Sequence, residues 1–149
     1  MEEFMENIQN PFSGILAGSV NDEEKIKASG LFDILEQYQI PYLYQIISSD
    51  RNPEKLREYC LKNKPYQKVV IAVAGGVPNL PIVVKSWMPD TLVISVPLED
   101  KTDYALASLT TPSDVPVIVS GFGMSGLKKA AYITRDIYNL FSLKNAHRL

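Results

Sequence analysis

Residues 68–76 read KVVIAVAGG, in which the unbroken apolar run VVIAVA at 69–74 is followed at once by two glycines. A strand that is buried on both faces has this continuous pattern, whereas a half-buried strand alternates apolar and polar residues. Burial on both faces is typical of a parallel sheet that carries helices on each side. This stretch therefore predicts the central strand of such a sheet.

Similar apolar runs lie on both sides of this strand, with helical patterns between them. We predict strands at 12–17, 42–48, 68–74, 92–96 and 117–120, and helices at 23–39, 53–61, 79–85, 104–109 and 125–141. Strands that alternate with helices pair in parallel through right-handed crossovers. The sequence predicts a three-layer, doubly wound α/β fold, Rossmann-like or flavodoxin-like, with a mostly parallel five-stranded sheet and a long C-terminal helix. Residues 12–149 are predicted to form one domain and residues 1–11 an N-terminal arm.

The composition excludes several classes of function. The 149 residues contain 15 Lys and Arg against 17 Asp and Glu, a net charge of −2, so we expect neither nucleic acid nor a membrane as a partner. No apolar run is long enough to span a bilayer, and the acidic first residues do not resemble a secretory signal. With Cys60 as the lone cysteine, a cytoplasmic location is expected. The single histidine, His147, leaves no internal imidazole for catalysis.

The sequence GFGMSG at 121–126 matches the G-x-G-x-x-G pattern of dinucleotide-binding folds. That motif belongs on the first strand–helix–strand unit, with an acidic residue on the following strand about 20 positions later. Here it follows the last predicted strand, and no further strand comes after it. We therefore interpret these glycines as close packing between a helix and the sheet.

Polar and small residues follow several of the predicted strands, where ligands bind in sheets of this kind. Ser19 and Asp22 suit a phosphosugar, because the carboxylate can accept hydrogen bonds from ribose hydroxyls; alternatively, Asp22 only caps the next helix. Arg51 lies beside a predicted helix N-terminus, where it could help to hold a phosphate. The alternative for Arg51 is an ordinary solvated side chain.

Together these loops carry a resemblance to a known family. The segments GSVND (18–22), SSDRNP (48–53), AGGVPNLP (74–81) and SVP (95–97) resemble, in order and spacing, the G-S-x-S-D, S-A-H-R-T-P, A-G-G-A-A-H-L-P and G-V-P motifs of the PurE family. The agreement extends from about residue 12 to residue 138. Members of that family are mutases of purine biosynthesis that move a carboxylate from the exocyclic nitrogen to C4 of an aminoimidazole ribonucleotide.

The resemblance implies a homo-oligomer, specifically an octamer, that binds a small-molecule ribonucleotide and uses no metal and no cofactor. It implies that the ribonucleotide is bound by Ser19, Asp22, Ser48, Arg51, Gly75, Gly76 and Asn79. The two family histidines fall on Asp50 and Asn79, and the histidine replaced by Asp50 is the one that shuttles the proton at C4. Asp50 is therefore the candidate catalytic residue.

Aspartate is a poorer proton shuttle than histidine at neutral pH, because its ordinary pKa lies near 3.9 and that of histidine near 6.5. Three interpretations follow from the replacement at Asp50. The chain is a divergent enzyme, either an intramolecular mutase or a carboxylase-type lyase. Alternatively, it is a catalytically impaired relative that keeps the pocket as a binding or regulatory module. The third interpretation is a structural scaffold, which would be favoured if Phe122 or other side chains filled the pocket.

Overall fold

Five strands form a single parallel sheet in the computed structural model, which describes residues 10–99 and 101–146. The strands are β1 (Ser13–Ala17), β2 (Tyr42–Ile46), β3 (Val69–Ala74), β4 (Leu92–Pro97) and β5 (Ile118–Val119). Their order across the sheet is β2-β1-β3-β4-β5, and each neighbouring pair is parallel. The predicted doubly wound α/β fold is confirmed.

The strand that the sequence placed at the centre is fully buried. All six residues of β3 are buried, and β3 lies between β1 and β4. In the register, Ile71 is opposite Ile15 of β1 and Ile94 of β4. The side chains of these central strands feed two separate cores, one on each face of the sheet.

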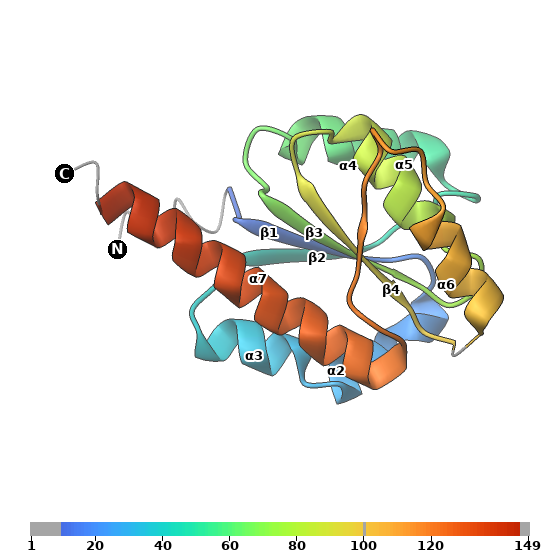
Figure 1. Cartoon of the computed structure of the whole chain (residues 1–149), viewed down its shortest axis with the longest axis horizontal. Coiled ribbons are helices and arrows are strands. Elements are labelled where there is room, and N and C mark those ends of the chain that lie inside the picture. The colour runs from blue at the N-terminus through green and yellow to red at the C-terminus, as the bar shows by residue number, and fades with distance from the viewer. Residues whose placement is uncertain (1–9, 100, 147–149) are drawn as a thin grey trace.

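Helices cover both faces of the sheet (Figure 1). They are η1 (Val20–Asp22), α2 (Glu23–Ala28), α3 (Leu31–Gln37), α4 (Pro53–Asn63), α5 (Asn79–Trp87), α6 (Thr102–Leu109) and α7 (Gly123–Ala146). Helices α2, α3 and α7 pack together on one face, and α4 and α5 pack on the other. No helix in the described part of the chain has both the length and the apolar character needed to cross a bilayer.

The predicted helix at 23–39 is wrong, because two helices occupy that stretch. Helix α2 ends at Ala28 and α3 begins at Leu31. Between them, Gly30 has a φ of +86°, a left-handed conformation that glycine adopts without the steric conflict of a Cβ. The Ser29 hydroxyl closes the break: its Oγ donates to the Ile26 carbonyl at 2.6 Å and accepts from the Leu31 amide at 3.1 Å.

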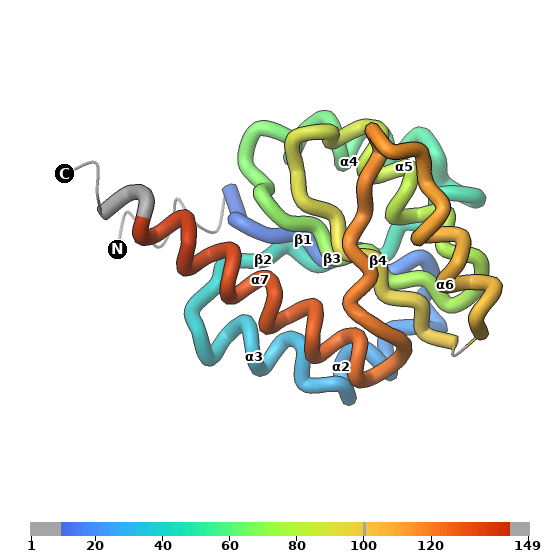
Figure 2. Tube along the Cα trace, in the orientation of Figure 1, coloured from blue at the N-terminus to red at the C-terminus, as the bar shows by residue number. Residues whose placement is uncertain are grey.

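The C-terminal helix α7 begins two residues before and ends five residues after the predicted bounds of 125–141. It runs alongside α3, and its C-terminal part extends past the sheet (Figure 2). Phe12, just before β1, packs edge-on against Tyr138 and Phe141, with ring centroids 4.9 and 5.5 Å apart. These contacts fix α7 to the start of the first strand.

The glycines at 121–126 pack the N-terminal turn of α7 against the loop that precedes it. A Cβ on Gly126 would overlap the carbonyl group of Gly121, which itself has a φ of +142°. The Ser120 hydroxyl donates to the Gly126 carbonyl at 2.8 Å. A Cβ on Gly126 would also lie 3.1 Å from the Cγ1 of Val96 on β4, so α7 packs closely on the sheet here, in support of the packing interpretation.

Candidate functional site

A pocket of about 780 Å³ lies at the carboxyl ends of β1, β2 and β3. Its lining comes from four segments of the chain: Gly18, Ser19, Asn21 and Asp22; Ser48, Ser49, Asp50 and Arg51; Ala74, Gly75, Gly76, Val77, Asn79 and Leu80; and Glu99. All eight residues that the sequence nominated are in this lining. The phenyl ring that could have filled the pocket, that of Phe122, is not among the lining residues.

The β1 loop contributes a hydroxyl and a buried carboxylate. The Ser19 Oγ accepts a hydrogen bond from the Asn21 amide at 3.2 Å, which starts the short helix η1. Asp22 is only 7% exposed, and its Oδ2 has no hydrogen-bond partner among the described residues. The Asp22 side chain also makes no capping hydrogen bond to α2. Helix capping therefore does not account for Asp22.

Asp22 needs a glycine beside it. A Cβ on Gly75, in the loop after β3, would lie 2.7 Å from the Asp22 Oδ1. Any side chain at position 75 would clash with this carboxylate. The loop after β3 can therefore approach the loop after β1 only because residue 75 is a glycine. The small residues after β3 thus leave room for a buried acidic group.

Burial sets the electrostatics of Asp22. Loss of hydration raises the pKa of this carboxyl above its ordinary value, and nearby Lys25 and Arg51 partly oppose the rise. Glu99, in the loop after β4, adds to the rise. The buried Oδ2, which has no partner among the described residues, carries a desolvation penalty in the folded protein.

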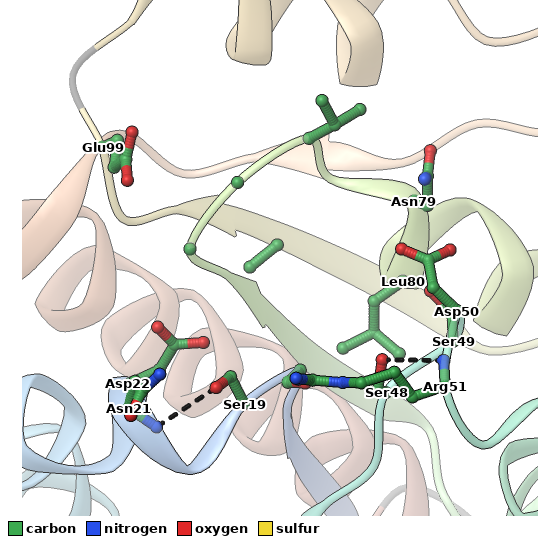
Figure 3. A pocket seen from close by; sticks show the side chains of 15 residues that line it. Ser19, Asn21, Asp22, Ser48, Ser49, Asp50, Arg51, Asn79, Leu80 and Glu99 are labelled. Carbon is green, nitrogen blue, oxygen red and sulfur yellow. Dashed lines mark hydrogen bonds between the residues drawn. The ribbon is translucent and has the colours of Figure 1, made fainter.

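The β2 loop is a tight turn that places Asp50 at its tip. The Ser48 Oγ accepts from the Arg51 amide at 3.1 Å, and the Ser48 carbonyl accepts from the Asn52 amide at 2.9 Å. The Arg51 side chain crosses to β1, where its Nη2 donates to the Gly18 carbonyl at 3.1 Å. The guanidinium therefore lies next to the Ser19 and Asp22 loop, while the exposed Asp50 carboxylate does not (Figure 3).

The charged and amide side chains separate into two ends of the pocket. Figure 3 shows Asp50 and Asn79 on one side, with Asp22 and Glu99 on the other. Asn79 is the first residue of α5 and is exposed. Among the described residues, three carboxylates and one guanidinium line the pocket.

Among the polar side chains of the lining, Asn21, Ser49 and Glu99 were not predicted from the sequence. A signal for Glu99 was present, because this carboxylate follows the end of β4 by two residues, and β4 is adjacent to β3. His147 lies outside the described residues, so the structure does not test its position. Among the described residues there is no cluster of three or more side chains suited to a metal ion.

Comparisons with known proteins point to one family. The sequence model of the AIR carboxylase family matches residues 13–149. The chain is 32% identical over 146 residues to an N5-carboxyaminoimidazole ribonucleotide mutase of Bacillus subtilis (strain 168), covering 93% of this chain and 87% of that protein. It is 36% identical over 137 residues to the protein of the same name from Pyrococcus horikoshii, covering 89% of this chain and 75% of that protein.

Solved structures agree on the fold. The crystal structure of Treponema denticola PurE superposes with a TM-score of 0.67 at 17% sequence identity, covering 91% of this chain and 94% of that chain. The same parallel sheet with helices on both faces is therefore present in both proteins.

Proposed function

Because the chain belongs to the AIR carboxylase family, also called PurE, we propose that it is a cytoplasmic PurE-like protein of purine biosynthesis whose pocket binds an aminoimidazole ribonucleotide. One observation carries this proposal: residues from separate loops that match the family motifs converge on a single pocket. Such convergence is not required by the fold, since loops at the carboxyl ends of the strands are free to vary in sequence.

The chemistry of the pocket suits a phosphosugar. The Arg51 guanidinium and the Ser19 hydroxyl can bind the 5′-phosphate, because a guanidinium donates charge-assisted hydrogen bonds to phosphate oxygens. The Asp22 carboxylate, which lines the pocket, can accept from ribose hydroxyls. The backbone of Gly75 and Gly76 allows close approach of the ligand. The heterocycle then lies toward Asp50 and Asn79.

The first candidate activity is the mutase reaction. The bond between the exocyclic nitrogen and the carboxylate breaks, and a carbon–carbon bond forms at C4. A proton leaves C4, and one is returned to the nitrogen. In this candidate, Asp50 moves the proton, because its side chain lies at the end of the pocket that faces the heterocycle.

A second candidate is a binding or regulatory module without turnover. It is favoured by one specific observation: the described lining of the pocket contains no imidazole, and an exposed carboxylate stands at the position of the family's proton-shuttling histidine. An imidazole, whose ordinary pKa lies near neutral pH, is better suited than a carboxylate to deliver a proton there.

Ultraviolet spectroscopy separates the two candidates. An active mutase converts the N-carboxylated ribonucleotide into its C4-carboxylated isomer, and Asp50→Ala reduces that rate. The absence of turnover at high protein concentration would contradict the mutase. Restored turnover in Asp50→His would then show that only the proton shuttle is missing.

Calorimetry tests the binding on which both candidates depend. Aminoimidazole ribonucleotide should bind saturably to the wild type, and Arg51→Ala should weaken binding about 10- to 100-fold through the lost charge-assisted hydrogen bond. Arg57→Ala is a matched control, because Arg57 lies on α4, packs over the Trp87 ring and is outside the pocket. No binding to the folded wild type would refute the proposal.

The proposal includes a homo-oligomer, with the octamer of the family as the expected size. The outer part of α7 exposes Leu140 and Leu143, which are 65% and 58% exposed. Such apolar residues on a helix that extends past the sheet suit a contact between subunits. Light scattering should give the mass of eight chains, and a monomer at micromolar concentration would contradict this part of the proposal.

A further inference from the structure

The end of the pocket that contains Asp50 and Asn79 carries an unneutralised negative charge. Asp50 is exposed and forms no ion pair with any described residue. The adjacent Arg51 does not neutralise it, because that guanidinium crosses to the Gly18 carbonyl at the other end of the pocket. By contrast, Glu99 forms an ion pair with Lys101 at 3.2 Å.

The chemical character of this end is that of a hydrogen-bond acceptor. An ionised carboxylate only accepts hydrogen bonds, whereas the neighbouring Asn79 carboxamide both donates and accepts. A heterocycle that presents an amino group can donate an N–H to Asp50. A heterocycle that presents a carboxylate there meets a like charge and gains no hydrogen bond from Asp50.

We infer that the Asp50 end of the pocket selects an aminoimidazole ribonucleotide whose heterocycle carries a free amine and no carboxylate. This selectivity rests on the proposed ribonucleotide binding and on the second candidate function, because the substrate and the product of the mutase are both carboxylated. Specificity of this kind comes as much from repelling the wrong ligand as from attracting the right one. Asp50 is then the residue that determines which ribonucleotide the pocket accepts.

The size of the discrimination follows from Coulomb's law. At an effective dielectric constant of about 40 to 80, which suits an exposed site, two like charges about 5 Å apart disfavour binding of the carboxylated ligand by about 3- to 15-fold. Because Asp50 is exposed, mobile ions screen part of this repulsion, so the discrimination should decrease as the salt concentration rises.

Isothermal titration calorimetry with two ligands tests the inference: 5-aminoimidazole ribonucleotide and its 4-carboxylated derivative. The wild type is expected to bind the uncarboxylated ligand about 3- to 15-fold more tightly. Asp50→Asn keeps the shape of the side chain without its charge, and it should bring the two affinities within about twofold of each other. Glu54→Gln is the control, because it removes an exposed charge from the first turn of α4, outside the pocket, and should leave the ratio unchanged.

Each outcome has one meaning. Equal or tighter binding of the carboxylated ligand to the wild type, or an unchanged ratio in Asp50→Asn, would overturn the selectivity while leaving ribonucleotide binding in place. An equal loss of discrimination in Glu54→Gln would attribute the effect to overall charge and would also overturn it. Binding of neither ligand would refute the proposed function itself.

Discussion

Substitution of Gly126 by alanine sets two effects of opposite sign against each other. In the interior of a helix, alanine is about 1 kcal/mol more favourable than glycine, so helix propensity alone predicts a more stable protein. At this position, however, the new Cβ would overlap the backbone carbonyl of Gly121 and lie 3.1 Å from the Val96 Cγ1. Overpacking of this kind typically destabilises by about 1–3 kcal/mol.

The clash should win, because the overlapped atoms are backbone and have little freedom to move. Gly121 is held at a φ of +142°, and the Ser120 hydroxyl bonds to the carbonyl of Gly126 itself. We therefore take the upper part of the overpacking range and subtract the gain in helix propensity. The net loss in the free energy of unfolding is about 2 kcal/mol, which lowers the Tm by about 4–8 °C in a protein of this size.

Urea denaturation followed by far-ultraviolet circular dichroism measures this change as a lower midpoint at an unchanged m-value. Gly76→Ala is the matched control, because a Cβ there would meet no atom within 4 Å and the backbone is not left-handed. Its stability should be unchanged or higher by up to about 1 kcal/mol. If Gly126→Ala were as stable as the wild type, the contact between the 121–126 loop and α7 would not be as close as described.

Three further substitutions probe the pocket and the core. Gly75→Ala should weaken ribonucleotide binding about tenfold in calorimetry, since its Cβ would lie 2.7 Å from the Asp22 Oδ1; unchanged affinity would mean that the Asp22 position is unimportant. Leu127→Ala should reduce the free energy of unfolding in urea by about 2–5 kcal/mol, because Leu127 is fully buried in the core beneath α7; a loss below 1 kcal/mol would contradict that packing. Asp22→Asn tests the raised pKa of Asp22: the folded protein holds that proton more tightly than the unfolded chain, so the stability of the wild type relative to Asp22→Asn should rise as the pH falls from 7 toward 4. A stability difference that does not change with pH, in urea titrations at both values, would show that the pKa of Asp22 is the same in the folded and unfolded chains.

The sheet could be predicted from sequence because its strands are short apolar runs whose pattern reports burial directly. The break between α2 and α3 could not. Ile26, Leu31, Ile34 and Leu35 keep helical spacing across the break, and a single glycine within such a pattern is often tolerated in a continuous helix. The left-handed φ of Gly30 turns the chain between α2 and α3. Both short helices then contact α7.

The pocket loops could be predicted from sequence because strand ends of a parallel sheet gather at one edge, and the resemblance to the family motifs implied the individual residues. The state of each side chain could not be predicted. The Asp22 side chain does not cap α2 but lies in the pocket next to Gly75, which comes from a loop more than 50 positions away. The sequence likewise does not predict the hydrogen bond from the Arg51 guanidinium to the Gly18 carbonyl. The positions of the Asp22 and Arg51 side chains depend on contacts between loops that are far apart in the sequence.

The turn that carries Asp50 has an evolutionary consequence. Its hydrogen bonds run between Ser48, Arg51 and Asn52, and the exposed Asp50 side chain takes no part in them. Replacement of that side chain therefore leaves the turn, the sheet and both cores intact. A lineage can change the chemistry at this position by one mutation without first acquiring a stabilising one. The architecture thus permits functional drift at this position of the pocket lining, and a saturation library at position 50 should yield folded protein for nearly every residue.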